Sequence, residues 1–352
     1  MPHRDPPQLP HEAVHLFHDD QTGLRAVVAI HSTALGPAIG GCRVQRYASE
    51  SDATHDALRL SEAMTYKNSL TGLPFGGGKA VIMLPEDGVP DRAALFEAFG
   101  RCVQSLGGRF ITAEDAGSGV ADMQSAARAT RFVAGLPQQA SGLGGDPSPW
   151  TASGVFQAMC AAVTARGGWL DGAVVGVQGL GNVGMALAGL LHGAGAKLLV
   201  SDVDEARVAD AVTRFDAERV APDKIVTAPM DIFAPCALGG AIDAVTVNRL
   251  QARIVCGGAN NQLAHPSLGA ELARRGIFYA PDYLVNAGGI IAVCAEYQSG
   301  DVGAVEAAVA EIGPRLVEVM RDADLHGGTP GEVADRRARQ LVAEGWSRRR
   351  AA

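Results

Sequence analysis

The stretch AVVGVQGLGNVGMALAGLL at residues 173–191 decides the fold of the second half of the chain. It begins with an apolar run, continues through a Gly-x-Gly-x-x-Gly turn, and ends in an Ala- and Leu-rich run. A strand, a glycine-rich turn and a helix in this order are the context in which the glycine pattern indicates a dinucleotide-binding turn. We therefore predict a phosphate site at the first turn of the helix that begins near Asn182.

Each glycine of this turn has an expected task. Gly179 permits the tight turn, Gly181 lets a pyrophosphate approach the backbone, and Gly184 lets helix and strand pack closely. The next predicted strand ends at Asp202, whose carboxylate would accept hydrogen bonds from an adenosine ribose, with Asp204 as second candidate. The carboxylate of Asp202 would repel the 2′-phosphate of NADP, and no arginine next to it in the sequence would neutralise that phosphate. We therefore predict NAD rather than NADP. The remaining predicted cofactor-binding residues of the turn are Leu180, Asn182 and Val183.

The pattern around this turn indicates the domain organisation. Further strands near Ile254 and Ile277 continue the rhythm of a doubly wound parallel sheet. Residues 136–149 are rich in Gly, Pro, Ser and Gln, which is typical of a crossing between domains. A length of 352 residues also favours two domains. We predict an α/β protein of three parts: a substrate-binding and oligomerisation domain at 1–140, a Rossmann-type NAD-binding domain at 141–330, and a C-terminal helix and tail at 331–352 that could pack on the first domain.

The first half alternates strand and helix patterns around a core of its own. A turn at 19–23 separates two strand-like runs, which predicts a hairpin. The other predicted elements are helices at 52–70, 91–106, 304–320 and 331–344, and strands at 80–84, directly after three glycines, and at 109–113.

Composition and charge narrow the possible partners. The net charge is −8 and the only basic cluster is RRR at 348–350, so we predict no nucleic-acid partner. No apolar run approaches the roughly 18 residues that a membrane helix needs. The six cysteines never come closer than 20 residues, and residues 1–10 lack the apolar core of a signal peptide. These features favour free thiols in a cytoplasmic protein.

His11-Glu12-Ala13-Val14-His15 spells the HExxH motif of zinc peptidases. That motif needs a helix, where residues four apart share a face. Here it runs into the predicted hairpin, and on a strand residues four apart are separated by about 13 Å. We therefore predict no metal site and no peptidase activity.

Three residues of the first half are candidates for chemistry: Lys67 late in the long helix, Lys79 after three glycines, and Asp115 at a strand end. A lysine acts as a base near neutral pH only where burial or a neighbouring cation favours its neutral form. Gly76 to Gly78 would leave room for a substrate beside Lys79, and the apolar residues after it would wall off water.

Seven motifs carry a resemblance to a known family. They are GPAIGG at 36–41, MTYKN at 64–68, GGGK at 76–79, TAED at 112–115, APCALGG at 234–240, GANNQ at 258–262 and NAGG at 286–289. In this order and together with the dinucleotide turn, the chain resembles the glutamate/leucine/phenylalanine/valine dehydrogenase family from about residue 24 to 298.

The resemblance implies a reversible, NAD-dependent oxidative deamination of an L-amino acid to its 2-oxo acid and ammonia, in an enzyme that is usually a homo-oligomer. It implies that Lys79 is the general base that activates water, helped by the positive charge of Lys67, and that Asp115 carries protons to and from the amine. Lys67, with backbone near Gly41, would bind the substrate carboxylate, and Asn261 the amino group. Thr151 and Asn286 would hold the nicotinamide carboxamide, with Cys236 and Ala237 lining the cofactor.

Ile39, Ala113 and Val293 stand where this family recognises the substrate side chain. Ile39 and Val293 offer no partner for a side-chain carboxylate, and burying one unpaired costs several kcal/mol, so glutamate is disfavoured. The sequence favours valine or leucine, with phenylalanine as the alternative, because Pro74 and Phe75 are more similar to certain phenylalanine enzymes. A non-catalytic NAD-binding sensor is the alternative of another class.

Overall fold

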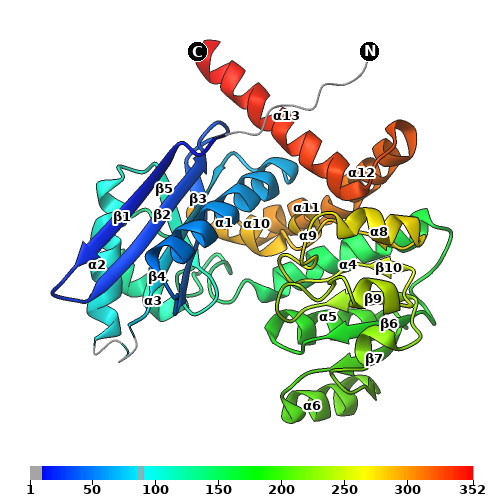
Figure 1. Cartoon of the computed structure of the whole chain (residues 1–352). Coiled ribbons are helices and arrows are strands. Elements are labelled where there is room, and N and C mark those ends of the chain that lie inside the picture. Colours follow the sequence, from blue (N-terminus) through cyan, green and yellow to red (C-terminus); the bar gives the residue numbers. More distant parts are fainter. Residues whose placement is uncertain (1–9, 86–87, 89–90, 352) are drawn as a thin grey trace. The chain divides into compact units, whose positions relative to one another are not determined.

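The computed structural model describes residues 10–85, 88 and 91–351, and the chain divides into two compact units (Figure 1). Unit 1 comprises Met1–Pro147, Ile290–Val305 and Arg336–Ala352. Unit 2 comprises Ser148–Gly289 and Glu306–Asp335. The chain first leaves unit 1 within the Gly- and Pro-rich segment 136–149. It later returns to unit 1 twice, so unit 1 is made of three separate segments of the chain.

Unit 1 is built on a five-stranded mixed sheet with the order β1-β2-β4-β3-β5. Its strands are β1 (Ala13–Asp19), β2 (Leu24–Ser32), β3 (Ala38–Gln45), β4 (Gly76–Met83) and β5 (Phe110–Glu114). β1 and β2 pair antiparallel, which confirms the predicted hairpin. β4 pairs antiparallel with β2 and parallel with β3, and β3 pairs parallel with β5.

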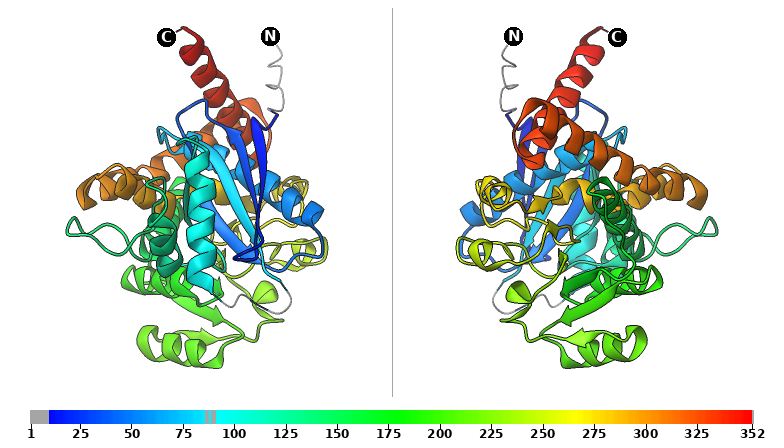
Figure 2. Two further views of the ribbon diagram at one scale, coloured as in Figure 1. Left: turned by 90° about the vertical axis from the view of Figure 1, so that its left-hand side faces the viewer. Right: turned by 90° about the vertical axis from the view of Figure 1, so that its right-hand side faces the viewer.

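Helices cover both faces of this sheet (Figure 2). The burial of the β2 side chains on both faces shows why. Ala26, Val28 and Ile30 lie in one apolar cluster with Phe96 and Phe99 of α2 (Arg92–Ser105) and Met123 of α3 (Val120–Ala127). Val27 and Ala29 lie on the other face with Ala53 and Ala57 of α1 (Glu50–Leu70). A strand that is buried on both faces reads as a continuous apolar run, as this one does.

Strand β4 begins earlier than the sequence predicts. The prediction started this strand at Ala80, whereas the structure starts it at Gly76 and includes all three glycines. A Cβ on Gly77 would collide with the backbone of Thr65 in α1, and one on Gly76 would collide with the carbonyl of Ser32. The glycines therefore let the backbone of the strand approach its neighbours within unit 1.

Unit 2 contains a six-stranded parallel sheet with the order β11-β10-β9-β6-β7-β8. The strands are β6 (Val174–Gln178), β7 (Lys197–Ser201), β8 (Glu218–Arg219), β9 (Ile232–Pro235), β10 (Ile254–Val255) and β11 (Phe278–Tyr279). The chain builds outward from β6 in one direction and from β9 in the other, which confirms the doubly wound topology. Ligands of such sheets bind beyond the carboxyl ends of the strands where the order reverses, here β6 and β9.

The helices of unit 2 flank this sheet, and α4 (Ser148–Ala165) packs against α5 (Asn182–Gly193) and α12 (Ile312–His326). The others are α6 (Glu205–Phe215), α7 (Thr246–Arg249), α8 (Leu268–Arg274) and α9 (Asp282–Val285), with a 3₁₀ turn at Ile225–Thr227.

Three helices begin in one unit and end in the other: α10 (Gly288–Tyr297), α11 (Val302–Ala310) and α13 (Pro330–Ala351). The single helix predicted at 304–320 is wrong, because the structure divides it into α11 and α12. Pro314 explains the break, since proline has no N–H to donate and is tolerated only in the first turn of a helix. Over the residues that the structure describes, no helix combines the length and the apolar character needed to cross a membrane.

Candidate functional site

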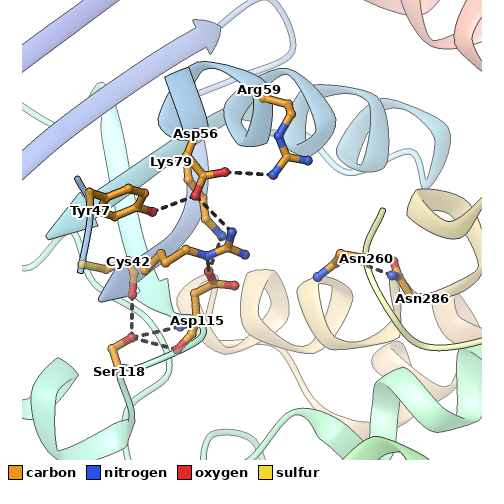
Figure 3. Close-up of polar contacts among 10 residues, drawn as sticks. Cys42, Tyr47, Asp56, Arg59, Lys79, Asp115, Ser118, Asn260 and Asn286 are labelled. Atoms are coloured by element: carbon orange, nitrogen blue, oxygen red, sulfur yellow. Dashed lines mark hydrogen bonds and ion pairs between the residues drawn. The ribbon is translucent and has the colours of Figure 1, made fainter. Parts of the chain in front are cut away.

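In unit 1, the structure brings Lys79 and Asp115 together, although β3 lies between their two strands in the sheet. Lys79 lies in β4 and Asp115 directly follows β5. The Nζ atom of Lys79 lies 2.9 Å from Oδ2 of Asp115, and only 5% of the lysine side chain is exposed (Figure 3). A buried lysine in contact with a carboxylate can exchange a proton with a reacting group at a site that water reaches poorly.

The backbone around Asp115 is fixed by short-range contacts. The hydroxyl of Ser118 accepts a hydrogen bond from the Asp115 backbone N–H (3.0 Å) and donates one to the carbonyl of Cys42 in β3 (2.7 Å). A Cβ on Gly41 would lie 2.5 Å from the carbonyl oxygen of Glu114 and 2.7 Å from Cβ of Asp115. Gly41 therefore has a structural task, since only glycine lets Asp115 lie this close to β3.

A second cation contacts the same carboxylate. Nε of Arg43 donates to Oδ2 of Asp115 (3.0 Å), and its NH1 donates to Oδ2 of Asp56 in α1 (3.2 Å). Burial alone would raise the pKa of Asp115, but the charges and hydrogen bonds of Lys79 and Arg43 outweigh it and hold this pKa below its ordinary value. Asp115 is therefore ionised at neutral pH.

Sequence reasoning missed Arg43 and its partners Asp56 and Tyr47. A signal was present, because Arg43 is the one charged residue within the strand sequence AIGGCRVQ. A charged side chain in an otherwise apolar strand indicates a buried ion pair, but it does not indicate which residue is the partner.

Glu114, the neighbour of Asp115, lies in different surroundings. Burial and the negative charges of Asp146 and Glu296 raise its pKa to about 7. The two adjacent carboxyl groups therefore differ in protonation at neutral pH. Asp115 is ionised and paired with Lys79, whereas Glu114 is close to half-protonated.

The three residues predicted to face the substrate side chain lie in one apolar cluster. Ile39, Ala113 and Val293 pack together with Phe75 and Ile111, and the cluster also holds Ala134 and Cys294. Lys67, predicted to bind the substrate carboxylate, is half-buried in the last turn of α1.

In unit 2, the glycine turn follows β6 as predicted. Gly179 has a φ of +94°, and a Cβ there would lie 2.6 Å from the backbone nitrogen of Ala237. Gly184 packs against the carbonyl of Gly179 and against Cys236. At Gly181 the surroundings are open, because a Cβ at this position would have NH1 of Arg207, 4.0 Å away, as its nearest neighbour. Two glycines of the turn thus serve protein packing, and Gly181 leaves space beside the backbone.

Asp202, directly after β7, is hydrogen-bonded to this turn. Its Oδ2 accepts the backbone N–H of Leu180 (2.5 Å), and its Oδ1 accepts the backbone N–H of Asp204 (2.8 Å). Arg207 of α6 pairs with Asp204 (3.3 Å) and is the residue nearest to Gly181. An arginine therefore does lie at the turn, and the electrostatic argument against a 2′-phosphate depends on Asp202 alone.

A group of asparagines lies on the loops after β10 and α9. Nδ2 of Asn286 donates to Oδ1 of Asn260 (2.9 Å; Figure 3) and to the carbonyl of Gly258 (3.3 Å). The buried Oδ1 of Asn286 has no hydrogen-bond partner among the described residues. Asn261 has a φ of +52°, and its carbonyl accepts the backbone N–H of Gly240 (2.7 Å).

The remaining predicted cofactor residues are Thr151, in the first turn of α4, and Cys236, which follows β9. The sulfur of Cys236 accepts the backbone N–H of Gly258 (3.4 Å). Burial raises the pKa of this thiol to about 11, so it stays neutral and is no nucleophile at neutral pH.

These features of unit 2 fit a nicotinamide dinucleotide. The space at Gly181 and the first turn of α5 suit a pyrophosphate. The unpartnered Oδ1 of Asn286 suits a carboxamide N–H₂, since a buried acceptor without a donor is costly. Among the described residues no group of three or more metal-binding side chains occurs. His15 lies within β1 and His11 precedes it, as expected for a strand rather than a peptidase helix.

Two family models match the chain. Residues 11–132 match the model described as "Glu/Leu/Phe/Val dehydrogenase, dimerisation domain". Residues 200–324 match the model described as "Glutamate/Leucine/Phenylalanine/Valine dehydrogenase". Together they span most of both units.

Individual proteins match over almost the whole chain. Leucine dehydrogenase of Thermoactinomyces intermedius is 44% identical over 94% of this chain and 91% of its own length. Valine dehydrogenase of Streptomyces albus is 44% identical over 96% of this chain and 94% of its own length. The crystal structure of L-tryptophan dehydrogenase from Nostoc punctiforme superposes with a TM-score of 0.82, at 39% identity, over 96% of this chain and 97% of that one.

Proposed function

Because the chain belongs to the glutamate/leucine/phenylalanine/valine dehydrogenase family and is an amino-acid dehydrogenase, we propose that it converts a hydrophobic L-amino acid reversibly into its 2-oxo acid, with NAD as cofactor. The amino acid, NAD⁺ and water give the 2-oxo acid, ammonium, NADH and one proton. The observation that carries this proposal is the buried contact between Lys79 and Asp115 in unit 1.

Unit 1 supplies the groups that handle protons. Lys79 accepts a proton from the water that attacks the imino acid. General-base catalysis of this kind typically increases the rate by about 10²–10⁴-fold. Asp115, ionised and in contact with Lys79, stabilises the iminium cation and carries protons to and from the amine. Lys67 and the backbone near Gly41 bind the substrate carboxylate.

Unit 2 supplies the groups that hold the dinucleotide. The turn from Gly179 to Gly184 receives the pyrophosphate, and Asp202 binds the adenosine ribose. Asn286 and Thr151 orient the nicotinamide, and Asn261 binds the substrate amino group. A dinucleotide held by these residues would supply the acceptor for the hydride that leaves Cα of the amino acid.

The apolar cluster of Ile39, Ala113 and Val293 supports a hydrophobic substrate. These three side chains are apolar, and a glutamate side chain buried among them would find no partner on them, at a cost of several kcal/mol. The leucine and valine dehydrogenases among the relatives favour a branched aliphatic amino acid. A methylene or two is worth only about 1–3 kcal/mol of discrimination, so phenylalanine is the competing substrate.

We assign the substrate groups to a domain at 1–140 and the dinucleotide groups to a domain at 141–330, with the helical segment 331–352 after them. The match of residues 11–132 to a model described as a dimerisation domain supports a homo-oligomer.

A panel of L-amino acids with NAD⁺ or NADP⁺, read as absorbance of the reduced cofactor, tests the proposal. We expect reduction of NAD⁺ with valine or leucine, and the reverse reaction with the 2-oxo acid, ammonium and NADH. Fastest turnover with phenylalanine would correct the substrate, and fastest turnover with NADP⁺ would correct the cofactor. If NAD binds but no amino acid is oxidised, the chain is a sensor and the proposal is wrong.

The substitution Lys79→Ala tests the base. We expect turnover to fall about 10²-fold or more, while NAD binding, followed by protein fluorescence, stays unchanged. The exposed Lys197→Ala is the matched control and should keep normal turnover. Near-normal turnover of Lys79→Ala would remove this residue from the mechanism.

A further inference from the structure

Arg43 is a buried cation at the candidate site that the proposed reaction has not yet used. It lies in β3, and 16% of its side chain is exposed. Removing a guanidinium from water is costly unless carboxylates pair with it, and two do. Its Nε donates to Asp115 (3.0 Å) and its NH1 to Asp56 (3.2 Å). Burial lowers the pKa of Arg43, but the two carboxylates raise it overall, so the guanidinium keeps its charge.

Asp56 anchors Arg43 independently of Asp115. The hydroxyl of Tyr47 donates to Oδ2 of Asp56 (2.7 Å), and NH2 of Arg59 donates to its Oδ1 (2.8 Å; Figure 3). Burial raises the pKa of Asp56, but these hydrogen bonds and the charge of Arg43 lower it overall. Asp56 therefore remains a carboxylate that is held from three sides, and it fixes the direction of the Arg43 side chain.

Arg43 and Lys79 contact the same oxygen of Asp115. Both the 3.0 Å contact of Arg43 and the 2.9 Å contact of Lys79 are to Oδ2. These two contacts fix the position of this oxygen. They also divide the negative charge of Asp115 between a lysine, which can lose its proton, and an arginine, which cannot.

The other titratable groups around Asp115 add little charge of their own. In β3, burial together with the charge of Asp115 raises the pKa of the Cys42 thiol far above its ordinary value, so Cys42 is neutral. From α1, Asp56 and Arg59 act through Arg43. Asp122 of α3 is neutralised by Arg92 (2.7 Å).

We propose that Arg43 is a positioning residue of the reaction, which orients Asp115 and shares its negative charge so that Lys79 gives up its proton more readily. This inference rests on the proposed function, because it assumes that Lys79 acts as the base. Without Arg43, Lys79 would be the one cation among the described residues in contact with Asp115, and the carboxylate would stabilise its protonated form more strongly.

The pH dependence of kcat and kcat/KM for oxidative deamination, measured for the full-length enzyme and for Arg43→Gln, tests this inference. We expect the acid-side limb of the Arg43→Gln profile to move by about one pH unit to higher pH. Turnover should fall about tenfold near neutral pH and recover in part at high pH, while NAD binding stays unchanged. Arg43→Lys, which restores a cation, should move the limb back towards the wild-type position.

Arg59→Gln is the matched control, because it removes an arginine from the same Asp56 without touching Asp115. Its pH profile should match that of the wild type. If Arg43→Gln is poorly folded, Asp56→Asn keeps Arg43 but removes a carboxylate that neutralises it, and should move the limb in the opposite direction, to lower pH. An Arg43→Gln enzyme with reduced turnover at every pH and an unmoved limb would show a structural role only, and would overturn the inference. A wild-type enzyme inactive with all amino acids would instead overturn the proposed function.

Discussion

Glu114 and Asp115 are adjacent in the chain, but their carboxyl groups are in opposite electrostatic surroundings. Asp115 is in contact with Lys79 and Arg43, which lower its pKa against the effect of burial. Glu114 is buried near Asp146 and Glu296, which raises its pKa to about 7. Only one of the two is therefore suited to stabilise a cation throughout the physiological pH range.

The raised pKa of Glu114 predicts a stability effect. The folded state binds this proton more tightly than the unfolded state, so the free energy of unfolding decreases as the pH rises from about 4.5 through 7. Glu114→Gln removes this decrease. Allowing for partial exposure, we expect the variant to gain about 1–2 kcal/mol relative to wild type above pH 7, and little near pH 4.5.

Denaturant unfolding at about pH 5 and pH 8 measures this difference. The exposed Glu218→Gln is the control and should change stability equally at both pH values. If Glu114→Gln also shows no difference between the two pH values, Glu114 carries no excess proton in the folded state.

The sequence identifies residues of this site when their role shows in local pattern. Lys79 and Asp115 stand out because one follows three glycines and the other ends an apolar strand. The surroundings of Arg43 could not be predicted, because its partner Asp115 lies 72 residues away in the chain. For the same reason, the pKa of Glu114 could not be predicted, since it depends on Glu296 of α10.

At the scale of the element, the glycines of the dinucleotide turn serve two different purposes. Gly179 has positive φ and faces Ala237 at a distance that no Cβ tolerates. Gly181 has open space around it and is needed only if a ligand approaches the backbone.

This contrast predicts different outcomes for two alanine substitutions. Gly179→Ala should destabilise the fold by about 1–3 kcal/mol, because it adds strain and a collision. Gly181→Ala should leave the melting temperature unchanged in the absence of cofactor and weaken NAD binding at least about tenfold. Thermal unfolding and fluorescence titration with NADH measure both effects. Undiminished NADH binding by Gly181→Ala would show that no phosphate approaches this backbone.

Element prediction succeeded where several residues repeat a period. The hairpin and the helices α1 and α2 could be predicted because their apolar patterns extend over six or more residues. β8 has two residues and β9 four, too few to display a period. The start of β4 was wrong because glycine is rare inside strands, and here close packing against Thr65 and Ser32 overrides that preference.

At the scale of the whole molecule, the chain order predicted unit 2 but not the full extent of unit 1. A doubly wound sheet grows from consecutive strands and helices, so its order can be read along the sequence. Unit 1 also takes in residues 290–305 and 336–352, and Val293 reaches the cluster of Ile39 from more than 250 residues away. The segment 336–352 lies within the C-terminal helix and tail that we expected could pack on the first domain, whereas the return at 290–305 leaves no local signal.

The outer strand of unit 1 has an exposed apolar face. β1 pairs with β2 and lies at the edge of the sheet, and its residues Val14 and Leu16 are 42% and 51% exposed. An unprotected edge strand with apolar side chains invites pairing with another chain. This strand lies within the residues that match a dimerisation domain.

We therefore expect the protein to assemble into a homo-oligomer, with a mass that is a multiple of 36.3 kDa in light scattering after gel filtration. The double substitution Val14→Lys/Leu16→Lys should lower that mass, because two buried ammonium groups would oppose association. Val245→Lys/Leu325→Lys adds the same charge at exposed apolar positions of unit 2 and should leave the mass unchanged. A wild-type mass of one chain would refute the assembly, and an unchanged mass of the first variant would place the interface elsewhere than at β1.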